Sequence, residues 1–211
     1  MPSPPDITFS AVAIADIVVD GTVDQKDLLQ WYADFDIRGG SCTNWRNRLD
    51  QNNDLAVTVD DLFVFQQFWL QTHNCVIIDL SVISVDPAAR SATLRCTIHN
   101  PSGILALRQK NDINQEVEVW LHLDPALTAP IDGIRSDELV IDRCIASDLV
   151  WVKFTVGDVS TLRSFTAFTF QVFWNLETVP HQCRLPVRVK SAKLALDTCF
   201  GAWHGGIIRQ E

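Results

Sequence analysis

Acidic side chains recur at a fixed spacing in two stretches near the N-terminus, 16–28 and 50–62. Aligning Asp16 with Asp50 matches the stretches at a constant offset of 34 residues, and the aromatic residues behind them also coincide. A 12-residue loop binds Ca²⁺ through oxygens at its first, third, fifth, seventh, ninth and twelfth places. The spacing therefore predicts two calcium loops. Their predicted ligands are Asp16, Asp20, the Thr22 carbonyl, Asp24 and Asp27, and then Asp50, Asn52, Asp54, the Ala56 carbonyl, Thr58 and Asp61.

Each loop departs from the ideal pattern at one place. Val18 stands third in the first loop and offers no side-chain ligand. Leu55 stands sixth in the second loop, where a positive φ would strain a residue other than glycine, whereas the first loop has Gly21 there. The alternative is a pair of ion-free helix caps, because Asp and Thr are also good N-cap residues. We favour Ca²⁺ in at least one loop, since the repeat matches ligand spacing.

Each loop leads into an amphipathic segment. The spacing of apolar residues predicts helices over Asp24–Phe35 and Asp60–Gln71. The eighth loop residues, Val23 and Val57, are expected to pair in a short β-bridge. The large apolar side chains of both helices are expected to form a core, or otherwise a surface for a partner: Leu28, Trp31, Tyr32, Phe35, Leu62, Phe65, Phe68 and Trp69.

The duplicated pattern D-x-N-x-D-G-x-V-x-x-x-D-L, over residues 10–72, resembles the dockerin family. The resemblance implies a small helical calcium module that lacks the entering helix of an EF-hand. It also implies a protein partner, a cohesin-like domain. In dockerins the tenth and eleventh loop positions contact that partner. The corresponding residues here are Gln25 and Lys26 in the first repeat, and Val59 and Asp60 in the second.

The pattern changes after Asn74, where alternating apolar and polar residues indicate strands. The strong runs are Cys75–Val85, Ala92–His99, Glu116–Leu123, Leu149–Val156, Phe165–Trp174 and Arg184–Leu196, and the weaker ones are Glu138–Ile145 and Gly206–Gln210. Such spacing predicts an antiparallel β-sandwich, immunoglobulin-like or jelly-roll. The stretch TLRCTIHNPSG resembles immunoglobulin-like bacterial adhesion domains. The expected fold class is α+β with two domains, a dockerin-like module at 1–74 and a sandwich at 75–211.

The N-terminal residues are expected to be extended. Met1–Asp6 contains three prolines and favours a polyproline II conformation. Ile7–Ile17 could form a short strand or an apolar arm. The longer arm Ile7–Val19 is apolar enough to donate a strand to the sheet edge of a neighbour. Ile7–Val19 is a poor match to a signal peptide, because Asp16 interrupts it and no Lys or Arg precedes it.

The six cysteines include no C-x-x-C pair, which argues against a zinc site. They are Cys42, Cys75, Cys96, Cys144, Cys183 and Cys199. An even number fits three disulfides, and six buried thiols are the alternative. We expect Cys42 to pair with Cys75. Disulfides and weak Ca²⁺ sites both favour an extracellular or cell-surface location.

Charge and motifs exclude several functions. The net charge is −9, and residues 1–75 hold eleven Asp, no Glu and four Lys or Arg, which gives −7. An acidic chain without a basic stripe argues against nucleic acid and anionic membranes as partners. No apolar run is long enough for a membrane span. The sequence lacks the common hydrolase, metalloprotease and nucleotide-binding motifs, so we expect no enzyme.

Three tryptophans allow one further partner. Trp120, Trp151 and Trp174 lie on predicted strands, where they could stack on sugar rings if exposed, or belong to the core. The leading hypothesis is a non-catalytic extracellular assembly protein that uses Ca²⁺-stabilised loops and binds copies of itself in a filament, shell or surface layer, or a cohesin-like domain. The alternative is a cohesin-binding dockerin attached to a carbohydrate-binding sandwich.

Overall fold

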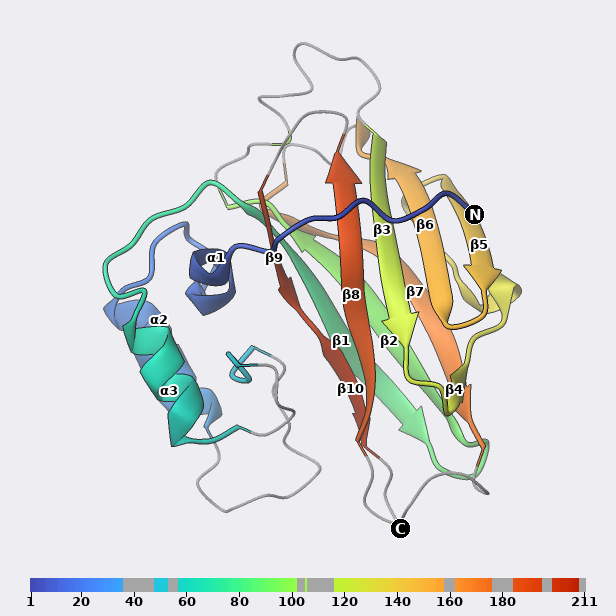
Figure 1. The fold of residues 1–211 in the computed structure, drawn as a ribbon, viewed down its shortest axis with the longest axis horizontal. Coiled ribbons are helices and arrows are strands. Elements are labelled where there is room, and N and C mark those ends of the chain that lie inside the picture. The colour runs from blue at the N-terminus through green and yellow to red at the C-terminus, as the bar shows by residue number, and fades with distance from the viewer. Residues whose placement is uncertain are drawn as a thin grey trace.

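The computed structural model describes residues 1–35, 48–52, 57–101, 105, 116–157, 162–175, 184–194 and 199–208. In this part of the chain, two five-stranded sheets face each other. Three helices gather beside one edge of this sandwich, next to the strands labelled β1 and β9 (Figure 1).

The strands of each sheet come from distant parts of the chain. The first sheet has the order β4-β7-β2-β1-β9 and the second the order β10-β8-β3-β6-β5. The first contains β1 (Val76–Asp86), β2 (Ser91–His99), β4 (Leu127–Thr128), β7 (Ser164–Trp174) and β9 (Phe200–Trp203). The second contains β3 (Glu116–Leu123), β5 (Ile141–Ala146), β6 (Leu149–Thr155), β8 (Arg184–Leu194) and β10 (Gly205–Ile208). A 3₁₀ turn, Ile131–Gly133, lies between β4 and β5.

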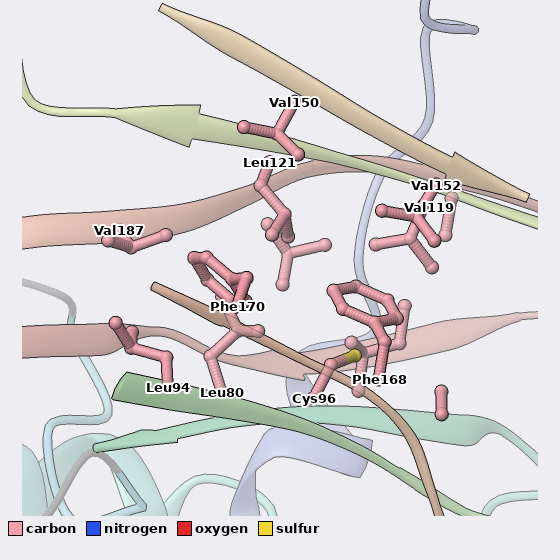
Figure 2. Packing of buried hydrophobic residues seen from close by; sticks show 14 of the residues in the cluster. Leu80, Leu94, Cys96, Val119, Leu121, Val150, Val152, Phe168, Phe170 and Val187 are labelled. Carbon is pink, nitrogen blue, oxygen red and sulfur yellow. The ribbon is translucent and has the colours of Figure 1, made fainter. Parts of the chain in front are cut away.

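The predicted sandwich is confirmed, because alternate residues of both sheets point into one shared core. Figure 2 shows part of this core, where large side chains of the first sheet meet β-branched and leucine side chains of the second. The labelled residues are Leu80, Leu94, Cys96, Phe168 and Phe170 from the first sheet, and Val119, Leu121, Val150, Val152 and Val187 from the second. Burial of this apolar surface, at about 25 cal/mol per Å², drives the two sheets together.

One detail of the sandwich corrects the prediction. The sheets are not wholly antiparallel, because β9 pairs with β1 in parallel, with Val76 opposite Phe200. All six strong runs and both weaker runs overlap observed strands, whereas β4 and β9 were not predicted. The four residues of β9 are all buried, so they show no alternation that a sequence pattern could reveal.

Two helices lie where the repeat predicts them. They are α2 (Gln25–Asp34) and α3 (Val59–Gln66), and Asp24 and Thr58 cap them. A third helix, α1 (Ala11–Ala15), replaces the strand or arm expected at 7–17. The longest of the described helices is too short, and not apolar enough, to cross a bilayer.

Helix α1 joins the helical part to the sandwich. Trp203 lies at the end of β9, and its indole nitrogen donates a hydrogen bond of 2.8 Å to the carbonyl of Ile14 in α1. Gly201 of β9 permits the approach, since an added Cβ there would lie 2.8 Å from the Cβ of Ala13. The helix therefore rests on a strand that must have a glycine at this position.

The disulfide prediction is wrong in its pairing. Cys75 is bonded to Cys199, not to Cys42. These two cysteines directly precede β1 and β9, and the parallel pairing of those strands places their first residues side by side. Cys96 and Cys144 are free thiols, so the six cysteines do not form three disulfides, and burial raises the pKa of Cys96 far above its usual range. Cys42 and Cys183 lie outside the described residues.

Candidate functional site

The twelfth residue of each loop closes its loop in the same way. The two oxygens of Asp27 accept hydrogen bonds of 2.8 Å from the backbone amides of Val18 and Asp24. Asp61 accepts in the same manner from Gln51 and Asn52 on one oxygen and from Thr58 on the other. Both carboxylates are fully buried. The structure thus confirms that the two stretches are repeats, and it makes their last Asp a structural clamp.

The first residue of the first loop is also held by protein donors. Asp16 is fully buried and accepts from the amides of Asp20, at 3.1 Å, and Gly21, at 2.7 Å. Gly21 has a φ of 92°, which is the conformation expected at the sixth place. His73 Nε2 lies 3.0 Å from the second oxygen of Asp16, and this histidine was not among the predicted site residues. His73 Nδ1 accepts from the Cys75 amide, so the imidazole connects the loop to the start of the sandwich.

The donor set of the first loop suits Ca²⁺ in kind, because it consists of carboxylate oxygens around a glycine turn. The arrangement suits it less well. Among the described residues, no three acidic, histidine or cysteine side chains converge on a common point. Lys26 Nζ lies 2.5 Å from Asp20, one of the predicted ligands. Burial raises the pKa of Asp27 to about 6, although the amides of Val18 and Asp24 act against that rise.

Other predicted ligands are placed only in part. Asp24 and Thr58 serve as helix caps, and each side chain accepts a hydrogen bond from the second residue of its helix. Asp50 is buried at the start of the second loop. Asp54, Leu55 and Ala56 lie outside the described residues, as does most of the region between the two repeats.

The expected bridge between Val23 and Val57 is not formed. The Val23 amide donates to the Gln71 carbonyl at 2.9 Å, and the Leu70 amide donates to the Val23 carbonyl at 2.8 Å. The neighbouring Thr22 is bridged to Thr72. The segment after α3 therefore folds back and takes the backbone groups that were expected to join the two loops.

The two helices bury and expose matching positions. From the pair Gln25 and Val59 onward through α2, residues 34 apart share the same burial class except at Gln30 and Val64. Trp31 and Phe65 are buried at equivalent positions and form the core of the helical part. Other aromatic residues that were expected in this core are instead at the surface, since Tyr32 is 55% exposed and Trp69 is 39% exposed.

An apolar stripe remains on the outside of the pair. Leu29 is 60% exposed and Phe63 is 58% exposed, and these residues occupy equivalent places in the repeat. Each follows by four residues a predicted partner contact, Gln25 or Val59, so each pair lies on one helix face. We call these exposed residues of the two helices the helical stripe; they are Gln25, Leu29, Tyr32, Val59 and Phe63. Exposed apolar patches of this kind mark binding surfaces.

The remaining predicted partner residues flank the stripe. Lys26 and Asp60 are exposed beside Gln25 and Val59. Lys26 pairs with Asp20 of its own loop, and that hydrogen bond raises the pKa of the lysine. Three of the four predicted contacts, Gln25, Val59 and Asp60, are exposed at the surface.

A polar cluster fixes the linker before the second repeat to the sandwich. Arg48 Nη2 lies 3.2 Å from the buried Asp79, and its guanidinium stands 5.0 Å from the centre of the Trp203 ring. Asp79 also lies 3.6 Å from His99 Nε2. Arg48, Asp79 and His99 border a pocket of about 420 Å³ that Ser164 and Glu138 also line.

His99 lines that pocket, and its Nε2 is buried without a hydrogen-bond partner in the described part of the chain. His122 lies on β3 of the other sheet and pairs with Asp148 at 2.8 Å. His99 and His122 therefore lie on different sheets.

The three strand tryptophans have different surroundings. Trp174 belongs to the core between the sheets. Trp120 and Trp151 are opposite each other on β3 and β6, and neither belongs to that core. Trp120 is only 1% exposed, because the N-terminal segment covers it, and the Trp151 indole donates to Glu118 at 2.8 Å. The three side chains do not form one open platform for a sugar.

Comparison with known proteins gives only distant similarities. No family model and no curated protein matches the chain, so the dockerin resemblance of residues 10–72 stays a prediction. A non-cellulosomal cohesin from the archaeon Archaeoglobus fulgidus is 9% identical, with a TM-score of 0.45 over 64% of this chain and 90% of that one. A type III cohesin module from a cell-surface anchoring scaffoldin of Ruminococcus flavefaciens is 9% identical, with a TM-score of 0.46 over 65% and 88%.

A third similar structure is a cohesin–dockerin complex from Clostridium thermocellum. It is 8% identical, with a TM-score of 0.46 over 64% of this chain and 94% of that one. Identities and TM-scores this low carry no functional argument. The β-sandwich assignment rests on the strand pairing of this chain itself.

Proposed function

We propose that this chain is a non-catalytic assembly protein that binds another folded protein through its helical stripe. The observation that carries the proposal is the matched exposure of Leu29 and Phe63, at 60% and 58%, in equivalent places of the two repeats. Two large apolar side chains at equivalent positions of two helices supply the kind of anchor that fills a pocket on a partner. A helix that packs its apolar face into a groove is a common mode of recognition.

The charge around the stripe indicates the chemistry of that partner. Residues 1–75 carry a net charge of −7, from eleven Asp and four Lys or Arg. Asp60 is exposed directly beside Val59, and Asp24 lies one residue before Gln25. We expect the partner to present an apolar groove with basic residues at its rim, since opposite charges at a rim accelerate association and exclude wrong partners.

Two kinds of partner suit this surface. The first is a further copy of the chain, which would build a filament, shell or surface layer. The second is a separate cohesin-like domain, which is what the dockerin resemblance of residues 10–72 implies. A carbohydrate partner finds less support, because Trp174 is in the core and Trp120 is covered.

Ca²⁺ binding to the loops is a further part of the proposal. Binding to the first loop would require Lys26 to leave Asp20 and the carboxylates to turn from backbone amides toward the ion. Such a site is useful where Ca²⁺ is abundant, outside the cell. The Cys75–Cys199 disulfide supports the same extracellular or cell-surface location, because disulfides persist in oxidising compartments.

Light scattering and circular dichroism of the full chain in millimolar Ca²⁺, and again after excess chelator, test both self-assembly and Ca²⁺ binding. Particles larger than one chain that dissociate on chelation would support calcium-dependent self-assembly. A monomer that loses helical circular dichroism on chelation would refute self-assembly and favour a separate partner. If neither size nor helical signal changes, the loops do not bind Ca²⁺ and act as helix caps only.

A further inference from the structure

The outer face of the second sheet carries two buried side chains that no strand of the described residues covers. Trp120 of β3 and Ser191 of β8 are opposite each other in the antiparallel pairing. Both are only 1% exposed, although neither belongs to the core between the sheets. The neighbours of Trp120 along the strand, Val119 and Leu121, point into that core, so Trp120 points to the opposite face.

The chain's own N-terminal segment covers this pair. Figure 1 shows residues 1–10 crossing the outside of β8 and β3. The Trp120 indole nitrogen donates a hydrogen bond of 3.2 Å to the Pro2 carbonyl, and the Ser191 hydroxyl donates one of 2.6 Å to the Pro5 carbonyl. Further along, the Ser10 amide donates to the Phe200 carbonyl at 2.6 Å and anchors the segment at β9.

The spacing of the two carbonyls matches one backbone conformation. A polyproline II helix has three residues per turn, so the carbonyls of residues three apart project to the same side. Pro2 and Pro5 are three apart and form a P-x-x-P sequence. Proline has no amide hydrogen, so the segment can offer its carbonyls to the sheet without leaving proline donors unpaired. Aromatic residues that donate to such carbonyls are the usual readers of proline-rich segments.

We propose that the outer face of β8 and β3 around Trp120 and Ser191 is a binding site for extended proline-rich peptides. In this chain the site is occupied by Pro2–Pro5, held nearby by its anchor at Ser10. A protein that carries a similar P-x-x-P segment therefore competes with the arm for the same two donors. Tethering gives the arm an effective concentration of the order of millimolar, so the competitor gains access when the arm is weakened.

A full-length variant with Pro2→Gly and Pro5→Gly keeps both carbonyls and the anchor but loses the polyproline II preference, which weakens the hold of the arm on the site. The Trp120 indole signal in ¹H–¹⁵N NMR, identified by its loss in Trp120→Phe, should move in this variant. Addition of a synthetic MPSPPD peptide should return it to the wild-type position in a saturable manner. The same peptide with both end prolines of its P-x-x-P replaced by glycine should not. An unmoved Trp120 signal in the variant, or equal effects of the two peptides, would overturn the proposal.

Affinity measurements identify the donors. In the Pro2→Gly, Pro5→Gly background, the anisotropy of fluorescein-labelled MPSPPD should report binding that Trp120→Phe weakens about tenfold, because one hydrogen bond and part of the ring contact are lost. Trp151→Phe is the matched control, since its indole donates to Glu118 and not to the arm; it should change binding by less than about twofold. Equal losses in both variants would contradict the assignment.

Discussion

Replacement of Asp61 by Asn should destabilise the helical part by about 3 kcal/mol. One oxygen of Asp61 accepts from the amides of Gln51, at 2.8 Å, and Asn52, at 3.2 Å, and the other accepts from Thr58 at 2.7 Å. Asn keeps one acceptor, and its amino group would face the Thr58 amide. A hydrogen bond to a charged group contributes about 1.5–3 kcal/mol, and the two remaining bonds also lose their charge assistance.

Urea unfolding, followed by circular dichroism at 222 nm, measures this cost. Asp60→Asn is the matched control, since Asp60 is the exposed neighbour of Asp61 and its change should stay within about 0.5 kcal/mol. If Asp61→Asn also stays within that limit, the carboxylate does not hold the loop closed and the reasoning is refuted.

The same two variants separate a cap from a ligand. The free-energy difference between Asp61→Asn and Asp60→Asn should be larger in millimolar Ca²⁺ than in chelator if Asp61 also binds the ion, because Ca²⁺ then stabilises the wild type more. Equal differences in both buffers would show that Asp61 is a structural clamp alone.

Three further predictions concern the sandwich and its junction. Gly201→Ala should cost about 1–3 kcal/mol, because its methyl group would meet Ala13, and urea unfolding with no loss would show that α1 moves freely. Replacing Cys75 and Cys199 by Ser should cost about 2–5 kcal/mol, since the bond closes a separation of 124 residues; an unchanged urea midpoint would contradict this. Burial lowers the pKa of His204 to about 4 from an unfolded value of about 6.5. Its contribution to stability is therefore complete above pH 6.5 and is lost as the pH falls from 6.5 to 4, by up to about 3 kcal/mol. Over this range the His204→Asn variant should lose less stability than the wild type, by about that amount, and parallel pH profiles would refute the assignment.

Local signals in the sequence were sufficient for the repeats and for most strands. Asp24 with Asp27, and Thr58 with Asp61, combine a cap with an acidic residue three places on, and both pairs form capping boxes. Alternation identified the strands of the sandwich because each has one face in the core and one face outside.

Long-range pairing could not be read in the same way. The Cys75–Cys199 bond follows from the parallel neighbours β1 and β9, and the four residues of β9 carry no alternation. The apolar run at 7–17 was predicted to be a strand or an apolar arm, whereas the structure has a helix there, with a cap at Ser10 and a contact to Trp203.

The sequence indicated the position of the proposed surface but not its extent. Gln25, Val59 and Asp60 are exposed as expected, whereas Leu29 and Phe63 were not singled out, although the offset of 34 residues already placed them in register. Helical periodicity shows that a face exists, and only the fold shows which face the rest of the chain leaves open.

Sedimentation velocity of the wild type, the Leu29→Asp, Phe63→Asp double variant and Val140→Asp tests the central claim most directly. Val140 is 90% exposed on the sandwich and controls for loss of an exposed apolar side chain elsewhere. With Ca²⁺ present, or with a cohesin-like domain added, the wild type and Val140→Asp should form the same complexes, and the double variant should sediment as a single chain. A double variant that associates as the wild type does would contradict the helical stripe as the binding surface.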